Sequence, residues 1–466
     1  MSGDMTRGNP FKQILLFSIP VFISNLCQQL YNMCDTVIVG RTISSDAMSG
    51  VGSTGPITFL ILGIALGLTA GFSVVVSNFY GAGNTEGVRR SIANSLVLCV
   101  AIAIILTAVA VPTAGPILRL MRTPAQYYEY AYWYLFTVFF GIGATVLYNI
   151  GAGILRALGN SKAPLVILVI TAFLNIALDL LFIVALKMTR AGAGLATVIS
   201  QFIAGLLCLV YLFIKYPELC PQKKDWRIGR VMTLRLIGVG LPMAIQYAIT
   251  ALGCMFRQFA LNDLNSLNPG IVTAYAATSK IENLLACSYT ALGVAMATYC
   301  GQNYGAKKSD RINQGVFIGM CYCVISWVIG VLISVVSFTP LMNLFIDKNS
   351  GDALLYFDAM IAYSEEFMLY LNLFFPTLGA VYVYRSALQS IGHSKATMIA
   401  GTLELIARCS MVFGVVHLIG YPAAFLAEPF AWIAADIFLV PMFYYSMKKR
   451  GSTLSLKKMF STKLDT

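Results

Sequence analysis

The chain has 466 residues, of which 58% are hydrophobic and 11% charged, and its mean hydropathy is +0.76. Soluble domains carry about 25% charged residues, so this composition excludes an ordinary soluble protein and predicts a chain surrounded mainly by lipid. The eleven cysteines are scattered without a C-x-x-C pair, and the two histidines lie far apart. These patterns favour neither a disulfide scaffold nor a zinc site, and we expect no cofactor.

Twelve apolar windows follow one another along the chain, and each meets the length of about 20 residues that a membrane-spanning helix needs. The windows are 14–39, 56–79, 91–113, 131–152, 164–186, 192–214, 236–260, 271–299, 315–338, 366–387, 397–418 and 421–445. The first is longer than a signal-peptide core and lacks an A-x-A cleavage pattern, so we interpret it as a span. The sequence therefore predicts an all-α integral membrane protein with twelve transmembrane helices.

The distribution of Lys and Arg predicts the topology, because cytoplasmic loops of membrane proteins carry an excess of these residues. With the N-terminus inside, the inner segments hold 22 Lys and Arg residues and the outer loops hold 6. We therefore expect a multi-pass protein of the inner (plasma) membrane with both termini in the cytoplasm. The net charge of +12 then reflects this bias and not nucleic-acid binding.

Three motifs recur in the same order in the two halves of the chain, and they predict an internal repeat. Pro20 corresponds to Pro242, Tyr80-Gly81-Ala82 to Tyr304-Gly305-Ala306, and the loop from Leu155 to Ala163 to the loop from Leu388 to Ala396. The offsets of 222, 224 and 233 residues are nearly constant. The chain is therefore expected to contain two halves of six helices each.

The repeat defines the expected domain organisation. We predict an N-terminal six-helix lobe (1–214), a cytoplasmic connector (215–235), a C-terminal six-helix lobe (236–447) and a cytoplasmic tail (448–466). Because each half has six spans, both halves start on the same side of the membrane. Transporters with such parallel repeats bind substrate between the repeats and work by alternating access.

Ionisable residues within the windows are candidates for function, because a charge in lipid is costly. Such candidates include Asp35, Asp179, Arg257, Lys280, Glu282, Glu404, Arg408 and Asp436. The first and fifth helices both run outward, so Asp35 and Asp179 are expected at the same depth, one to two turns from the outer surface. Asn175 precedes Asp179 by one helical turn, and Thr197 and Tyr134 are expected in the same layer.

This set of oxygen atoms suits a hard cation such as Na+, or a proton shared by two carboxyl groups. The alternative is that each side chain only forms hydrogen bonds between helices. The repeat aligns Asp35 with Arg257 and Asn175 with Arg408, which places cations in the second half where the first half has polar and acidic groups. Ion coupling is therefore expected in the N-terminal lobe.

The second half contains two further pairs of opposite charge. Glu404 and Arg408 are four residues apart on one helix, a spacing that predicts an ion pair. Arg257 and Glu282 form either another pair or part of the substrate wall. Asp436 has no assigned role. In the first half, Pro20 removes a backbone hydrogen bond in the middle of its span and is a candidate hinge.

The sequence resembles the multidrug and toxic compound extrusion (MATE) family, within the multidrug/oligosaccharidyl-lipid/polysaccharide (MOP) exporter group. The resemblance lies in P-x14-D-T-x-x-x-G starting at Pro20, in L-N-I-A-L-D from Leu174 to Asp179, and in the Y-G-A and R-A-L-G-N-S-K loops. It covers nearly the whole chain. It implies two pseudo-symmetric six-helix bundles of the MATE/MOP type, which export small amphipathic or cationic compounds such as drugs.

In members that resemble the DNA-damage-inducible (DinF-like) prokaryotic subgroup, the matching aspartates and their neighbours bind H+ or Na+. By this resemblance the ion-binding roles fall to Asp35, Asn175, Asp179 and Thr197, with Tyr134 and Asn149 nearby. Their position among the charges of the windows makes Arg257 and Glu282 further candidates for substrate or coupling. Another bacterial subgroup is associated with acidic coupling residues in the second lobe, where this chain has Arg257. We expect a monomer whose partners are small-molecule substrates and the lipid bilayer.

Three other functions are alternatives to the export of drugs. A flippase for lipid-linked saccharides shares the two-lobed plan, but such proteins are expected to have larger and more basic cavities. A membrane-embedded enzyme is disfavoured because the sequence has no Walker A loop, H-E-x-x-H or G-x-S-x-G motif. A passive channel is disfavoured because no G-Y-G filter sequence is present. The sequence therefore favours a secondary active antiporter driven by H+ or Na+.

Overall fold

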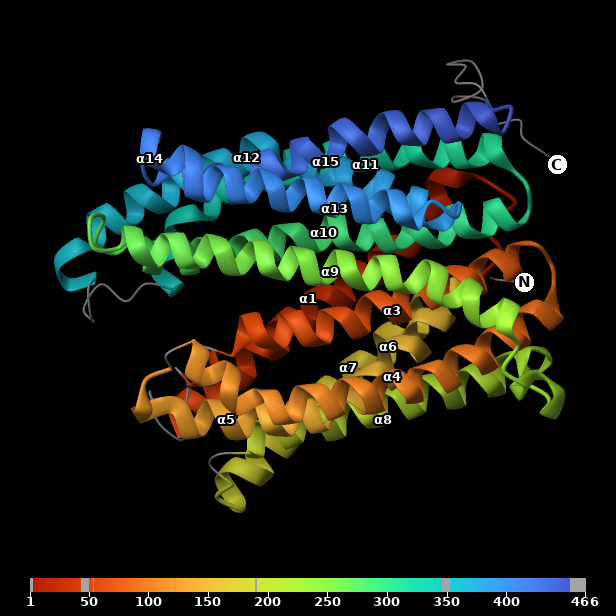
Figure 1. Ribbon diagram of the computed structural model, residues 1–466, viewed down its shortest axis with the longest axis horizontal. Coiled ribbons are helices and arrows are strands. Elements are labelled where there is room, and N and C mark those ends of the chain that lie inside the picture. Colours follow the sequence, from red (N-terminus) through yellow and green to blue (C-terminus); the bar gives the residue numbers. More distant parts are fainter. Residues whose placement is uncertain are drawn as a thin grey trace. The chain divides into compact units, whose positions relative to one another are not determined.

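The computed structural model describes residues 3–42, 50–52, 54–121, 123–188, 191–345 and 353–452. Within its helices the side chains of residues 35–37, 39–42, 339, 344–345 and 353–354 lie outside the described part. No strand occurs among the described residues, which form helices joined by short turns (Figure 1). The expected all-α fold is confirmed.

The first half of the chain contains seven described α-helices and three shorter helical segments. They are α1 (Pro10–Thr42), α3 (Gly55–Gly81), α4 (Thr85–Leu120), α5 (Ala125–Phe140), α6 (Ile142–Ala157), α7 (Lys162–Asp179), the π-helix η1 (Leu180–Ala185), α8 (Gly192–Lys215), and the 3-10 turns η2 (Pro217–Leu219) and η3 (Lys223–Trp226). Helix α6 packs against α3, α4 and α8, and α7 packs against α8.

The second half repeats this pattern of long helices. Its elements are α9 (Arg230–Leu264), α10 (Ile271–Gly305), α11 (Ser309–Phe345), α12 (Ala353–Ser390), α13 (Ser394–Cys409), the π-helix η4 (Ser410–Val415), α14 (Val416–Ile419) and α15 (Pro422–Lys449). Helix α15 packs against α12 and α13, and α11 packs against α12.

The described chain separates into two compact units. Unit 1 comprises residues 1–8, 15–248 and 298–308, and unit 2 comprises 9–14, 249–297 and 309–466. Helices α1, α9 and α10 therefore each contribute to both units. These units are defined by packing, whereas the lobes 1–214 and 236–447 come from the sequence repeat and stay a prediction.

The apolar windows correspond to helices long enough to cross a membrane. Eleven described helical segments have the necessary length and apolar composition, and a bent pair raises the number to as many as twelve. Several helices are longer than their windows, because polar turns extend the helix beyond the apolar region. Helix α4, for example, has 36 residues.

The fourth window, which was predicted as one span, is bent in the structure. Residues 131–152 fall on α5 and α6, which meet at Gly141 with a bend of 50°. A Cβ atom at Gly141 would lie 2.1 Å from a methyl carbon of Val198. The glycine therefore lets α8 approach the break closely, a contact that the apolar pattern does not reveal.

Small residues also set the packing of α3. A Cβ atom at Gly71 would lie 2.4 Å from the Cα atom of Gly240, and one at Gly67 would lie 2.6 Å from the backbone of Ala244. Close approach of this kind is typical of membrane helices, in which van der Waals contact between backbones drives association. Helix α3 therefore fits against the first part of α9 within unit 1.

Candidate functional site

A pocket in unit 1 lies among helices α1, α6, α7 and α8. It contains about 350 Å³ of open space. Most of its lining is polar but uncharged: Gln28 and Tyr31 from α1, Tyr148 from α6, Thr171 and Asn175 from α7, and Thr197, Ser200 and Gln201 from α8, together with Leu168, Ala172 and Ala204. The pocket is therefore rich in oxygen ligands.

Two of the predicted ion-binding residues line this pocket, and a third lies next to it. Asn175 is 2% exposed, and the hydroxyl of Thr197 donates to the carbonyl of Ala193 at 3.0 Å. Asp179 is one helical turn beyond Asn175 on α7 and is completely buried. The predicted neighbourhood of Asn175, Asp179 and Thr197 is therefore present in the fold.

The side chain of Asp35 lies outside the described residues, so only its position on α1 is known. Tyr31, one turn earlier on the same helix, lines the pocket, and so does Gln28 two turns earlier. The role of Asp35 in ion coupling therefore stays a prediction.

The other two first-half candidates lie beside the pocket without lining it. Tyr134 packs with Ile183 and Ala193, which are one turn beyond Asp179 and one turn before Thr197. Asn149 donates from Nδ2 to the carbonyl of Thr145 within α6 at 2.8 Å. These positions agree with the expected vicinity of the site, and any role in coupling stays a prediction.

Sequence reasoning missed the pocket residues Gln28, Tyr31, Tyr148 and Gln201. Gln201 accepts a hydrogen bond from the hydroxyl of Thr145. It also follows Thr197 by one turn of α8. A signal was available, because each of Tyr31 and Gln201 stands four residues from a predicted site residue on the same helix.

The backbone changes at this site as well. Helix α7 ends at Asp179, and η1 continues it with π-helical hydrogen bonding. Short π-helical segments in membrane and soluble proteins are frequently found at functional sites, because the wider turn shifts the side chains and disrupts the regular ladder. Asp179 therefore occupies the junction between two backbone geometries.

The corresponding region of unit 2 contains a network of buried ion pairs. Arg408 binds both oxygens of Glu428, with distances of 3.1 Å from Nε and 2.9 Å from NH2. The NH1 atom of Arg257 lies 3.4 Å from the same carboxylate. Glu428 therefore compensates two arginines that are both 5% exposed or less.

A second carboxylate extends the network. Glu404 lies 3.5 Å from NH2 of Arg408 and also accepts a hydrogen bond from Arg385. The predicted pair of Glu404 and Arg408 is therefore confirmed. Arg257 and Glu282 interact electrostatically, but among the described residues the ion-pair partner of Arg257 is Glu428.

Sequence reasoning overlooked Arg385 and Glu428, although both lie within apolar windows. Asp436, which had no assigned role, interacts electrostatically with Arg385. Its Oδ1 atom is buried and has no hydrogen-bond partner among the described residues. A complete list of charges in the windows would have revealed that three arginines need carboxylate partners in this half.

A bundle of spanning helices with a buried polar pocket defines the class of helical membrane transporters. The sequence model of the MatE family matches residues 20–181 and 242–416, one segment in each half. The chain therefore belongs to the MatE family. This family consists of transporters, so the chain is not an enzyme.

Individual relatives agree with this assignment. The chain is 27% identical over 400 residues to the probable multidrug resistance protein YpnP of Bacillus subtilis, covering 84% of each chain. It is 24% identical over 338 residues to DNA damage-inducible protein F of Escherichia coli, covering 70% of each. A solved outward-facing multidrug resistance MATE family transporter of the MOP superfamily matches with a TM-score of 0.87 at 22% identity, over 96% of this chain and 98% of that chain. The fold is therefore the MATE fold.

Proposed function

We propose that this protein is a cation-coupled antiporter that exports small amphipathic or cationic compounds, such as drugs, by alternating access. The similarity to a probable multidrug resistance protein and to a multidrug resistance MATE family transporter supports transport of drugs. The coupling ion is H+ or Na+. The observation that carries the proposal is the fully buried carboxylate of Asp179, one turn from a polar pocket lined by Asn175 and Thr197.

The coupling follows from the cost of burying a charge. An ionised carboxylate in a low-dielectric site is unfavourable unless a cation or hydrogen-bond donors compensate it. A proton or Na+ bound between Asp179 and Asp35 would remove that cost. Inward movement of one such charge releases about 2.3 kcal/mol per 100 mV of membrane potential, which is available to drive export.

A conformational change of α1 would link this binding to transport. Pro20 lies inside α1 and cannot donate a backbone hydrogen bond. The hydroxyl of Ser24 donates to the carbonyl of Pro20 at 2.9 Å, so a side-chain hydrogen bond is added in the turn after Pro20. We propose that α1 bends here when the cation binds. Arg257 and Glu282 stay candidates for contact with the substrate.

Efflux from loaded vesicles tests the proposal. Purified protein reconstituted with a fluorescent cationic drug should export it when a proton or sodium gradient is imposed, and an ionophore should stop export. Asp179→Asn keeps the shape and loses the charge, so gradient-driven efflux should fall by about 100-fold or more. Asp263→Asn alters an exposed carboxylate of α9 and should have no effect.

The outcomes separate the competing functions. Efflux that needs ATP and ignores both gradients would refute secondary transport. Movement of a lipid-linked saccharide in the same vesicles, without drug efflux, would support the flippase alternative. Normal gradient-driven efflux by Asp179→Asn would leave antiport possible but would remove Asp179 from the coupling site.

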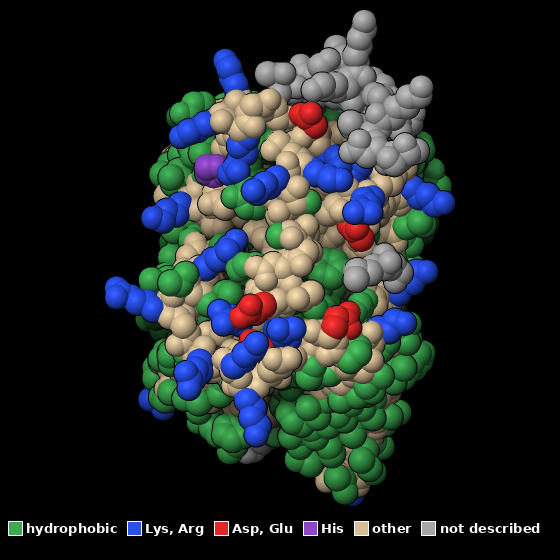
Figure 2. Space-filling view, turned by 90° about the vertical axis from the view of Figure 1, so that its right-hand side faces the viewer, with side chains coloured by type: hydrophobic (Ala, Val, Ile, Leu, Met, Phe, Trp, Pro, Cys, Tyr) green, Lys and Arg blue, Asp and Glu red, His purple; other side chains and the backbone are tan. Residues whose placement is uncertain are grey.

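We propose that the termini and the connector face the cytoplasm. Figure 2 looks onto the end of the molecule that includes the α3–α4 turn and the connector, and its Lys and Arg side chains far exceed the acidic ones, as expected of a cytoplasmic face.

Thiol labelling tests this topology. The connector carries the exposed native Cys220, and the α9–α10 turn carries Leu267, which is 80% exposed. In a variant without other cysteines, an impermeant thiol reagent added to intact cells should label Leu267→Cys and miss Cys220. The reverse pattern would invert the topology.

A further inference from the structure

The connector joins two membrane-spanning helices over a short distance. It leaves α8 at Lys215 and enters α9 at Arg230, and both helices are long and apolar enough to span. Between them it forms the turns η2 and η3. A segment of this length, tied at both ends to spans, stays close to the membrane surface. Its side chains therefore face either the protein or the membrane surface.

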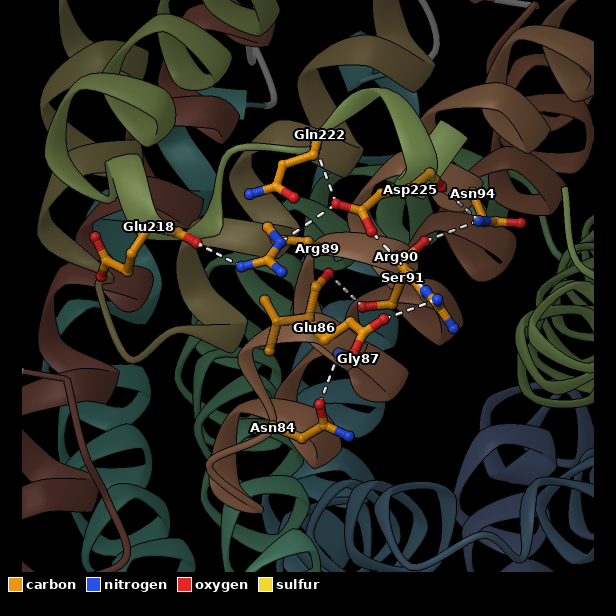
Figure 3. Close-up of polar contacts among 11 residues, drawn as sticks. Asn84, Glu86, Gly87, Arg89, Arg90, Ser91, Asn94, Glu218, Gln222 and Asp225 are labelled. Carbon is orange, nitrogen blue, oxygen red and sulfur yellow. Dashed lines mark hydrogen bonds and ion pairs between the residues drawn. The ribbon is translucent and has the colours of Figure 1, made fainter. Parts of the chain in front are cut away.

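One acidic residue of the connector faces the protein. Asp225 is 1% exposed, although its neighbours Lys224 and Trp226 are exposed. Figure 3 shows its carboxylate directed at the start of α4, where it lies 3.3 Å from Nε of Arg89 and 3.8 Å from Nε of Arg90. Its Oδ2 atom also accepts a hydrogen bond of 2.9 Å from the backbone of Gln222. The charge of Asp225 is therefore compensated internally.

Further contacts hold the connector in place on α4. Arg89 donates from NH1 to the carbonyl of Glu218 at 3.4 Å, and Asn94 donates from Nδ2 to the carbonyl of Asp225 at 3.4 Å. Leu219 is buried in the apolar core of the unit. The connector is thus fixed by both polar and apolar contacts, and Figure 3 shows the polar ones.

That outward surface is cationic and partly apolar. Between Gln222 and Arg235 the only acidic residue is the buried Asp225. The exposed residues include Lys223, Lys224, Arg227 and Arg230, interspersed with Trp226, Ile228 and Val231. Trp226 is 45% exposed. Tryptophan beside Lys and Arg is the combination that suits the headgroup layer, where the indole ring and the cations both find partners.

We propose that this surface, formed by Lys223, Lys224, Trp226, Arg227 and Arg230, binds the headgroups of anionic phospholipids in the leaflet that the connector faces. The cations match the phosphodiester charge, and Trp226 with Ile228 enters the interfacial layer. Asp225 is a positioning residue, because it holds the only negative charge between Gln222 and Arg235 inside the protein and ties the turn to α4. Glu218, which is exposed, precedes this surface in the connector. The proposal is independent of the transported compound.

Titration of lipid onto the delipidated, detergent-solubilised full chain tests the proposal, with bound lipids counted by native mass spectrometry. The wild type should bind phosphatidylglycerol more tightly than phosphatidylcholine. The triple variant K223Q/K224Q/R227Q should lose about tenfold or more of its phosphatidylglycerol affinity, because each cation near an anionic headgroup contributes to binding. The matched control K162Q/K448Q/K449Q removes the same charge at other exposed sites and should retain the affinity.

Trypsin cleavage gives a second measurement that does not depend on recovery of the triple variant. Cleavage of the wild-type connector should be several-fold slower in nanodiscs of phosphatidylglycerol than of phosphatidylcholine, and high salt should remove the difference. Millimolar inorganic phosphate in phosphatidylcholine nanodiscs should give no protection. Protection by phosphate alone, or equal cleavage in both lipids with equal lipid affinity of the two triple variants, would overturn the proposal.

The role of Asp225 has its own test. Asp225→Asn keeps the size of the side chain and loses the charge that attracts Arg89 and Arg90. Cleavage of the connector in phosphatidylcholine nanodiscs should then be several-fold faster than in the wild type. Asp263→Asn, an exposed change on α9, should leave the rate unaltered. An unchanged rate in Asp225→Asn would remove Asp225 from the positioning role.

Discussion

The region of α7 and η1 in unit 1 and the region of α13 and η4 in unit 2 share a backbone plan but differ in charge. Both helices follow a G-x-S-K-A loop, and both pass into a π-helical segment, at residues 180–185 and 410–415. Before the π-helix, the first carries Asn175 and Asp179 near a neutral polar pocket. The second carries Glu404 and Arg408 within a network of ion pairs.

The difference supports the proposal that one backbone plan serves two purposes. Binding of a cation to a buried carboxylate beside neutral oxygens is favourable, so the occupancy of such a site changes with an ion gradient. Carboxylates that already contact two arginines each gain little from a further cation. The first region therefore suits ion coupling, and the second suits a fixed structural framework.

Removal of Glu428 is the largest expected effect and tests the structural side of this comparison. Glu428→Gln would leave the buried Arg408 and Arg257 without their shared carboxylate. Breaking a buried ion pair by removing one partner costs about 3–5 kcal/mol. We expect a corresponding loss of free energy of unfolding, measured by denaturation in detergent, and low recovery from membranes. Glu365→Gln, an exposed change on α12, should have no such effect.

The same experiment on Asp179→Asn sharpens the contrast. If the first region serves coupling, this variant should unfold like the wild type while losing efflux. A finding that Glu428→Gln is as stable as the wild type but fails to transport would reverse the assignment of the two regions.

Substitution of Thr197 tests whether the pocket binds the cation, and its expected effect on cation affinity is smaller. Thr197→Ala removes one oxygen from the pocket, and a lost hydrogen-bonding group contributes about 1 kcal/mol, or about fivefold in apparent cation affinity. Thr197→Ser should restore the affinity, measured from the dependence of efflux on proton or sodium concentration. Thr402→Ala is the matched control, because Thr402 makes a similar bond to its own helix but lies exposed on α13. Equal effects of both alanine variants would exclude a specific role of Thr197.

The spans were predictable because the solvent imposes them. Each window of about 20 apolar residues forms helix, since lipid offers no partner for a bare backbone group. The break between α5 and α6 was not predictable, because it depends on the approach of Val198 to Gly141 from a distant helix. Helix ends also exceeded the windows, since polar residues continue a helix into the headgroup layer.

The candidate site was predictable where spacing along a helix determines it. Asn175 and Asp179 are one turn apart, and the topology brought Thr197 to their level. Gln28 and Gln201 were not identified from the sequence. A neutral amide in an apolar window costs less free energy to bury than a charge, so it does not stand out as a functional candidate. The sequence could not identify the ion-pair partner of Arg257, for a different reason. Glu282 and Glu428 both lie in the apolar windows, and only the packing of α9 against its neighbours selects Glu428.

The substitution of Pro20 is expected to have the smallest effect, and it tests whether the two halves differ in motion as well as in charge. Pro20 in α1 and Pro242 in α9 are repeat-related, and each leaves one carbonyl of its helix without the usual backbone donor. Pro20→Ala would supply that donor and stiffen α1, the helix that also carries Gln28 and Tyr31 of the pocket. We expect turnover to slow about threefold to fivefold, which corresponds to about 1 kcal/mol in the barrier, with little change in the substrate concentration for half-maximal efflux. Pro242→Ala should slow turnover less, because no coupling carboxylate is proposed for α9. If both variants slow turnover equally, the hinge is a property of the repeated scaffold and not of the coupling half.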